Sequence, residues 1–247
     1  MLKPRVIEVL ISDCVHFRGF RYGGFGNNIY EDYIVGLKGK CDITAVREKF
    51  VMRILALRDN SFAQALGIPL ERSYPAWLYP WSFSAMFRPK YSCWSPYNNP
   101  DIVCHFSPGG VLASHINREF FWLERAYTAM RSGYIPDRFG YITAFKLTSA
   151  KGTRYVVLDG NHRISALHSI GKSRVLVNVI RTVPMSEILL PVWPGVLSRN
   201  FSIQDSSSIL SRYFYDDNLT LPEDARQEIL YDEALLIDKS SYEERMP

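Results

Sequence analysis

The amino-acid sequence predicts a compact protein of mixed α/β (α+β) class, and three consecutive segments indicate this. Residues 155–158 form a short apolar run with two adjacent valines, which is typical of a buried strand. Three apolar residues then recur at helical spacing before Gly171, which suits a left-handed position after a helix: Ile164, Leu167 and Ile170. Residues 174–180 form a second buried run. We therefore expect a strand, a tight turn, a helix and a strand, arranged as a right-handed βαβ crossover.

Length and composition indicate a globular protein with ample core. The chain has 247 residues, of which 47% are hydrophobic, so one large or two small domains are expected and disorder is excluded. A net charge of +4 is too small and too scattered to indicate a nucleic-acid protein by itself. There is no 18-residue apolar run, and the apolar stretch near the start is too short for a signal peptide, so we expect no membrane span and a cytoplasmic location. The four cysteines lack Cys-x-x-Cys pairing, which favours buried free thiols.

The other elements follow from periodicity and turn residues. Apolar residues at helical spacing predict helices over residues 44–58, with Thr44 as cap, and over residues 114–133, with Ser114 as cap. Shorter helical patterns cover residues 60–67, 202–214 and 222–237.

Residues 159–163, the Asp159 turn, carry the strongest chemical signal. Gly160 lets the backbone approach a ligand, and the first amides of the following helix favour an anion. Arg163 adds a planar cation for phosphate, His162 a second donor, and Asp159 a carboxylate that can hold a metal or accept a proton. The structural alternative is a helix capped by Asp159 or Asn161, with a solvated Arg-His pair.

Residues 16–33 form a second unusual stretch, in which glycines, arginines and aromatic residues alternate. Arg18 and Arg21 would suit a phosphate. Glu31 and Asp32 follow as candidate acids or metal ligands. The spacing matches neither a P-loop nor a dinucleotide fingerprint. The alternative is a tight connection whose glycines serve backbone geometry only.

Residues 74–108 are dense in Trp, Tyr, Phe and Pro without a sustained period, which predicts an irregular, well-packed cap over the sheet. The same aromatic rings would also suit stacking on a base or a sugar. His105, His115 and Glu119 are candidates to face the Asp159 turn. No metal-binding histidine spacing occurs, so a divalent ion is expected to arrive with nucleotide phosphates.

The sequence Asp159-Gly160-Asn161-His162-Arg163, followed by a short helix and a strand, resembles the signature turn of the ParB/sulfiredoxin superfamily. The resemblance implies a ParB/sulfiredoxin-like core over residues 105–185, with residues 5–12 as its first strand. Residues 13–104 would then be a large N-terminal insertion, and residues 186–247 a helical C-terminal extension.

Departures from the family's pattern narrow the expected function. Asn161 stands where sulfiredoxin-like enzymes carry a reactive cysteine, and no helix-turn-helix follows Ile180 as in partitioning proteins. The closest remaining branch resembles kinases of free serine, which implies a nucleotide-dependent phosphotransferase using ATP or ADP and Mg²⁺. Its substrate would be a hydroxyl of a small molecule, with Glu119 or Glu31 as the base and Asp159 as the metal ligand.

Asn28-Ile29-Tyr30-Glu31 and the Asp159 turn also resemble stretches in proteins of bacterial surface-polysaccharide gene sets, and this resemblance implies a sugar or sugar-nucleotide substrate instead of an amino acid. The alternative function is a non-catalytic or nucleolytic ParB-like nucleic-acid-binding protein. Scattered charge and acids near the turn disfavour it.

Overall fold

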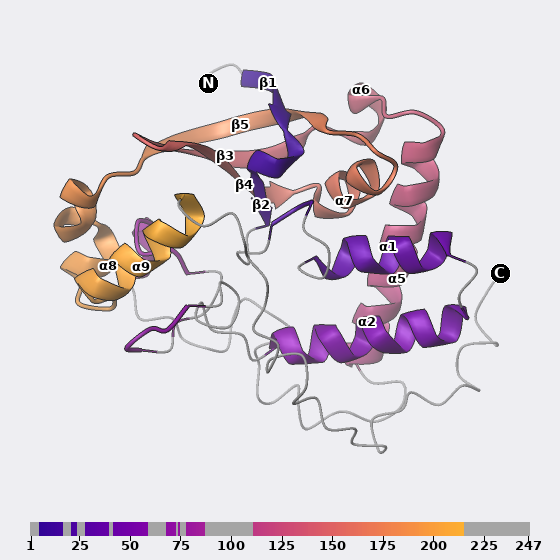
Figure 1. Ribbon diagram of the computed structural model, residues 1–247, viewed down its shortest axis with the longest axis horizontal. Helices are drawn as coiled ribbons and strands as arrows, with labels where there is room; N and C mark the ends of the chain where they lie inside the picture. Colours follow the sequence, from indigo (N-terminus) through magenta and orange to yellow (C-terminus); the bar gives the residue numbers. More distant parts are fainter. Residues whose placement is uncertain are drawn as a thin grey trace.

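The computed structural model describes residues 5–16, 21–23, 28–39, 42–58, 68–72, 74, 78–86 and 111–214. Its centre is a mixed five-stranded sheet with the strand order β1-β5-β3-β4-β2 (Figure 1). The strands are β1 (Arg5–Leu10), β2 (Cys14–His16), β3 (Ile142–Ser149), β4 (Gly152–Asp159) and β5 (Arg174–Pro184). The chain therefore has the mixed α/β class that the sequence predicts.

The pairing of the strands differs from the expected crossover. β3 and β4 form an antiparallel hairpin, and β5 pairs with β3 in parallel, so β4 and β5 are neither adjacent nor parallel. The prediction of a right-handed βαβ crossover between them is wrong. The physical reason is local: residues 150 and 151 close a tight turn that ends at Gly152 with φ +135°, and this short connection pairs β3 with β4 before the chain reaches the helix.

Strand β2 lies inside the segment that was expected to be an insertion. It pairs in parallel with β4, with Cys14 opposite Tyr155 and His16 opposite Val157. Residues 13–104 therefore contribute an edge strand to the sheet, in addition to the helices that follow. The expected first strand is confirmed as β1, which pairs with β5.

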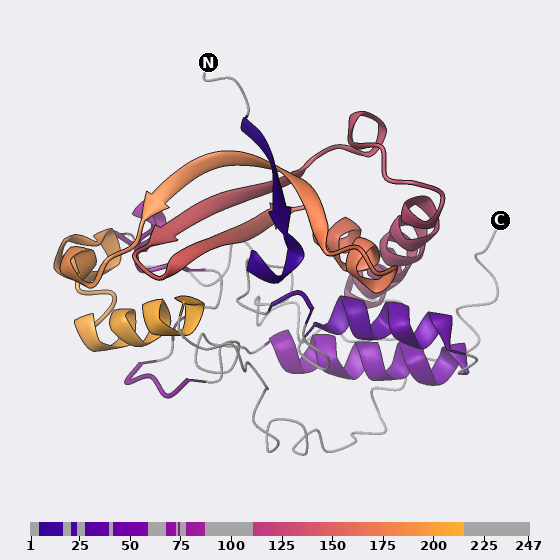
Figure 2. The same cartoon turned by 45° about the horizontal axis from the view of Figure 1, so that its top comes forward.

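Helices and loops cover the sheet in two groups. One group comprises α1 (Ile29–Lys38), α2 (Ile43–Arg58), α5 (Val111–Arg131), α6 (Pro136–Phe139) and α7 (Asn161–Ser169). The other comprises the short helices η2 (Phe83–Met86), η3 (Glu187–Val192) and α8 (Pro194–Leu197), with the longer helix α9 (Ile203–Phe214). Figures 1 and 2 show α1, α2, α5 and α7 together at one end of the sheet and α8 and α9 at the other.

Each group packs on its own hydrophobic cluster. Tyr155 and Val157 of β4 belong to the cluster with α1, α5 and α7, whereas Val156 belongs to the cluster with α9. Successive strand residues point to opposite faces, so β4 is buried on both sides. Tyr74 and Trp81, from the aromatic segment, pack in the second cluster, as the expected cap would.

Two of the predicted helix N-caps, Thr44 and Ser114, are wrong. Asp42 caps α2, since its Oδ1 accepts a hydrogen bond from Thr44 N at 2.9 Å, so Thr44 is not the cap. Helix α5 begins at Val111, so Ser114 lies inside it. Gly171 has φ +86°, which confirms the left-handed residue after α7. The predicted helices over residues 60–67 and 222–237 lie outside the described residues.

Among the described helices, we found none that is both long enough and apolar enough to cross a membrane.

Candidate active site at the ends of two parallel strands

The Asp159 turn lies where two parallel neighbours end side by side. His16 is the last residue of β2, and Asp159 is the last residue of β4. The imidazole of His162 contacts the ring of Tyr30 edge-on at 5.0 Å between centroids, and Tyr30 in turn lies 5.7 Å from the ring of His16. The carboxyl ends of parallel strands are a usual place for ligands in α/β proteins.

The central feature of the site is a histidine-carboxylate pair. His162 Nε2 lies 2.7 Å from Glu119 Oε2, and the two side chains are 27% and 20% exposed. Helix α5 brings Glu119 there because Phe120 and Leu123 bury its inner face against the helices around α7. In the tautomer with the proton on Nε2, the ring donates to Glu119, and Nδ1 is left as an acceptor.

Arg163 is held by backbone carbonyls. Its Nη1 donates to Phe139 O at 2.6 Å and also to Gly140 O, and its Nη2 lies 2.9 Å from Asp159 Oδ2. The side chain is only 17% exposed. The guanidinium expected to bind phosphate thus fastens the start of α7 to the end of α6, because two carbonyls at a helix end are strong acceptors.

Asp159 itself is open to solvent. Its side chain is 77% exposed, and one of its oxygens already accepts from Arg163. Within the described residues, no group of three His, Cys, Asp or Glu side chains is arranged to hold a metal ion. A single exposed carboxylate fits Mg²⁺ only as a partial ligand set, with the remaining positions supplied by phosphate oxygens and water.

The start of α7 is shaped by a glycine and has no side-chain cap. Gly160 has φ +93°, and a Cβ there would lie 2.9 Å from Ile142 Cγ1 and 3.2 Å from the backbone Cα of Ile142. Neither Asp159 nor Asn161 caps the helix, so that alternative is wrong. Asn28 does cap α1, by accepting from Tyr30 N and Glu31 N. Of the two helix starts at this edge, only that of α7 keeps its first amides free of a side-chain cap.

Tyr22 and Gly23 support the site from outside, and they contact different helices. The hydroxyl of Tyr22 donates to Asn161 Oδ1, and Gly23 N donates to Glu31 Oε2 at 3.1 Å. Burial and nearby ionisable groups raise the pKa of Tyr22 well above its ordinary value, which keeps this hydroxyl protonated. Tyr22 is 2% exposed, so it is a structural support for the first residue of α7.

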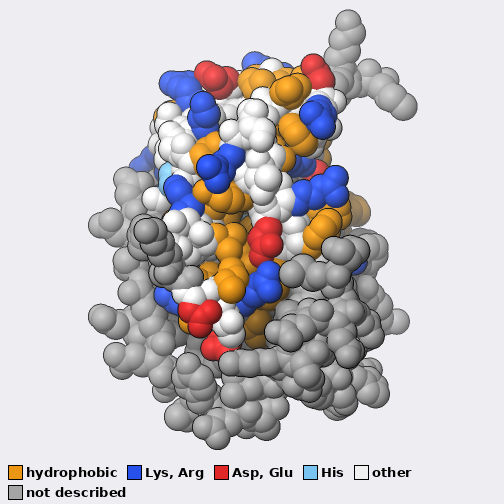
Figure 3. Space-filling view, turned by 90° about the vertical axis from the view of Figure 1, so that its right-hand side faces the viewer, with side chains coloured by type: hydrophobic (Ala, Val, Ile, Leu, Met, Phe, Trp, Pro, Cys, Tyr) orange, Lys and Arg blue, Asp and Glu red, His pale blue; other side chains and the backbone are white. Residues whose placement is uncertain are grey.

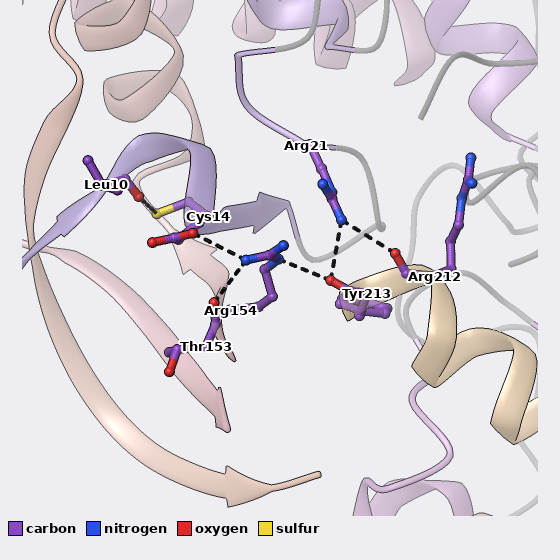
Figure 4. Close-up of polar contacts among 8 residues, drawn as sticks. Leu10, Cys14, Arg21, Thr153, Arg154, Arg212 and Tyr213 are labelled. Carbon is purple, nitrogen blue, oxygen red and sulfur yellow. Dashed lines mark hydrogen bonds and ion pairs between the residues drawn. The ribbon is translucent and has the colours of Figure 1, made fainter. Parts of the chain in front are cut away.

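Arg21 points to another part of the molecule. Its Nη2 donates to Tyr213 O at 3.3 Å and Arg212 O at 3.5 Å, beside Arg154, whose Nε donates to Tyr213 O at 3.0 Å (Figure 4). Both guanidiniums therefore satisfy carbonyls at the end of α9, where a cation is favoured. The structure does not bring Arg21 to the Asp159 turn, and Arg18 lies outside the described residues.

Glu31 forms a separate pair with His168. Its side chain is 8% exposed, and its Oε1 lies 3.2 Å from His168 Nδ1. The hydrogen bond to Glu31 raises the pKa of His168 above its ordinary value. Glu31 therefore ties the first turn of α1 to the last turn of α7 and is not placed beside His162.

Sequence reasoning did not single out the roles of Tyr22, Tyr30 and His168. Tyr22 and Tyr30 belong to the glycine- and aromatic-rich stretch of residues 16–33, but nothing in that stretch indicates that its rings contact the Asp159 turn. His168 lies one turn before the left-handed Gly171, where a basic residue is typical of a helix end, which was the available signal.

In comparisons with known proteins, no family model, curated protein or solved structure matched the chain. A proposal for the function of the site therefore rests on its geometry.

Proposed function

We propose that this chain has a ParB/sulfiredoxin-like core and is a nucleotide-dependent phosphotransferase that acts on a hydroxyl of a small molecule, a sugar or an amino acid. The observation that carries the proposal is the pair of Glu119 and His162, 2.7 Å apart, beside the uncapped start of α7. A base next to an anion site is the minimum that phosphoryl transfer to a hydroxyl requires.

The pair has separate roles in this reaction. Glu119 accepts a hydrogen bond from Nε2–H of His162 and fixes the ring, so that Nδ1 receives the proton of the substrate hydroxyl. The hydroxyl oxygen forms a bond to the terminal phosphorus of ATP, and the bond from that phosphorus to the bridging oxygen breaks to release ADP. The first amides of α7 bind the phosphoryl oxygens by hydrogen bonds and by the helix dipole.

Mg²⁺, when bound with the nucleotide, would neutralise phosphate charge, and Asp159 would be the carboxylate that holds it. Arg163 acts by positioning: it fixes the turn that carries Asp159 and His162. Because the nucleotide substrate must be abundant, we propose a cytoplasmic location.

A matched pair of substitutions on α5 tests the proposal. Glu119→Gln removes the carboxylate that orients His162, and Glu124→Gln is the control on the same helix. Glu124 is also hydrogen-bonded, by Tyr33 at 2.6 Å and Arg47 at 3.0 Å, but belongs to no candidate site. ADP release would be measured with ATP, Mg²⁺ and a panel of free sugars and amino acids, and nucleotide affinity by calorimetric titration.

We expect Glu119→Gln to lower turnover by about 10²- to 10⁴-fold with unchanged nucleotide affinity, and to shift the pH dependence of turnover. Glu124→Gln should leave turnover unchanged. Equal effects of the two substitutions, or no nucleotide binding by the unmodified protein, would refute the assignment.

A further inference from the structure

The outer face of α5 exposes aromatic rings that the core does not use. Phe120 and Leu123 on the inner face are 3% and 0% exposed, whereas Phe121 and Trp122 on the outer face are 54% and 44% exposed. The two outer rings contact each other edge to face at 5.2 Å between centroids. Adjacent exposed rings of this size on a helix are a marker of an interaction surface.

Phe121 lines an open groove between α5 and α6, and Trp122 lies beside the groove, in contact with Phe121 and with Arg125. The groove has a volume of about 590 Å³, and its lining residues are Phe121, Glu124, Arg125, Thr128, Ala129, Ser132, Arg138 and Phe139. From Phe121 to Ser132 it follows about 16 Å of helix axis at 1.5 Å per residue. The groove therefore combines two aromatic rings, two arginines and two hydroxyl groups.

The arginines lie on the rings and keep their N–H groups available. The guanidinium carbon of Arg125 lies 5.5 Å from the ring centroid of Trp122 and 5.9 Å from that of Phe121, and that of Arg138 lies 5.3 Å from Phe139. Within the described part of the chain, neither guanidinium has an ion pair or a hydrogen bond. Their charges are therefore not neutralised by the protein.

The single acid that lines the groove is already engaged. Glu124 accepts from Tyr33 at 2.6 Å and pairs with Arg47 at 3.0 Å. The groove is thus positive as a whole and complementary to an anionic partner. Figure 3 shows the side of the molecule on which α6 and the end of α5 lie, where Lys and Arg side chains lie beside hydrophobic ones.

From this geometry we infer that the groove between α5 and α6 binds a short stretch of single-stranded nucleic acid. Unpaired bases stack on exposed aromatic rings, arginines contact the phosphates between them, and neither interaction requires a particular sequence. A second copy of this chain fits poorly, since a two-fold contact through the groove would bring Arg125 and Arg138 against like charges. The inference is independent of the phosphotransferase proposed for the Asp159 turn.

Substitutions that separate stacking from charge test the inference. Trp122→Ala removes an exposed ring, and Arg125→Glu reverses an exposed charge. The matched controls are Phe83→Ala, at a ring that is 65% exposed, and Arg181→Glu, at an exposed position of β5. Binding of a fluorescent oligothymidylate of about 12 nucleotides would be followed by anisotropy over a range of salt concentrations, with unfolding curves for every variant.

We expect Trp122→Ala to weaken binding by roughly 5- to 150-fold, the usual effect of losing one stacking ring. Arg125→Glu should weaken binding and lower the slope of log affinity against log salt by about 0.7 for each lost phosphate contact. Both controls should bind like the unmodified protein.

Three results would overturn the inference. The first is the absence of oligothymidylate binding by the unmodified protein. The second is an equal loss of oligothymidylate affinity in the test and control variants. The third is that polyglutamate displaces the oligothymidylate equally well from the unmodified protein and from Trp122→Ala. The last result would assign the groove to acidic peptides. ATP titration of the same variants gives a separate readout of the Asp159 turn, which Trp122→Ala should leave unchanged.

Discussion

Replacing Gly160 by alanine tests whether the Asp159 turn depends on close packing or only on backbone freedom. The best comparison is Gly171→Ala at the other end of the same helix. Both glycines have positive φ, +93° at Gly160 and +86° at Gly171, so both alanines must adopt a left-handed backbone. Among the described residues, a Cβ at Gly171 would meet nothing within 4 Å, whereas one at Gly160 would meet Ile142 and Arg163.

The expected magnitudes follow from these contacts. The left-handed conformation should cost about 1–2 kcal/mol of unfolding free energy in each variant. At Gly160 the new Cβ would lie 2.9 Å from Ile142 Cγ1 and 3.1 Å from Arg163 Nη2. Ile142 is 0% exposed and has no room to move, so overpacking should add roughly 1–3 kcal/mol. We therefore expect Gly160→Ala to lose about 2–5 kcal/mol in total.

Urea unfolding of both variants, followed by circular dichroism, measures the contrast at equal m values. A larger loss for Gly160→Ala is expected, together with weaker ATP binding because the first amides of α7 are displaced. Equal losses in the two variants would show that Ile142 and Arg163 shift without cost, and the reasoning about packing at the turn would be wrong.

Two further predictions concern pairs of residues in the same region. Arg163→Ala should lower the free energy of unfolding by roughly 2–4 kcal/mol, since it removes charged hydrogen bonds to two carbonyls. Asp159→Asn should change the free energy of unfolding by less than about 0.5 kcal/mol, because that carboxylate is 77% exposed. Similar losses of unfolding free energy in the two variants would instead show that the ion pair between Arg163 and Asp159 is the stabilising contact. For His168, folding raises the pKa above 6.5, so its stabilising pair with Glu31 is complete below about pH 6.5 and is lost as the pH rises through the raised pKa. His168→Asn should flatten the fall in urea midpoint over that range, and an unchanged pH dependence would count against the pair.

The part of the fold that the sequence predicts best is the part with local signals. The run before Asp159, the positive-φ glycine after it and Gly171 mark β4, the turn and α7, since each signal needs only its own neighbours. Strand β2 was missed because three residues are too short for a periodic pattern. The expected crossover failed because strand pairing is a long-range property that apolar runs do not encode.

In the candidate site, too, the sequence predicts the residues that have a local signal and not the contacts that depend on packing. Glu119 and His162 were both named as candidates, and the structure places them 2.7 Å apart. The carbonyl partners of Arg163 were not foreseeable, since they are backbone atoms of Phe139 and Gly140, which any residue would provide. The pairing of Glu31 with His168 depends on how α1 packs on α7 and has no signature in either segment.

The pairing of the first strands with the last ones determines when the site can assemble. Arg5 pairs with Val179 and Cys14 with Tyr155, so both N-terminal strands have partners far along the chain. At a synthesis rate of about 5–20 residues per second, β2 leaves the ribosome roughly 8–30 s before α7 is complete. During that interval His16, Tyr22 and Glu31 have none of their partners from β4 and α7, and closing so long a loop is slow. The sheet should therefore form only after residues 155–184 have been synthesised, and a ribosome that stalls before Ser169 would carry an N-terminal segment whose apolar edge is exposed to chaperones and to aggregation.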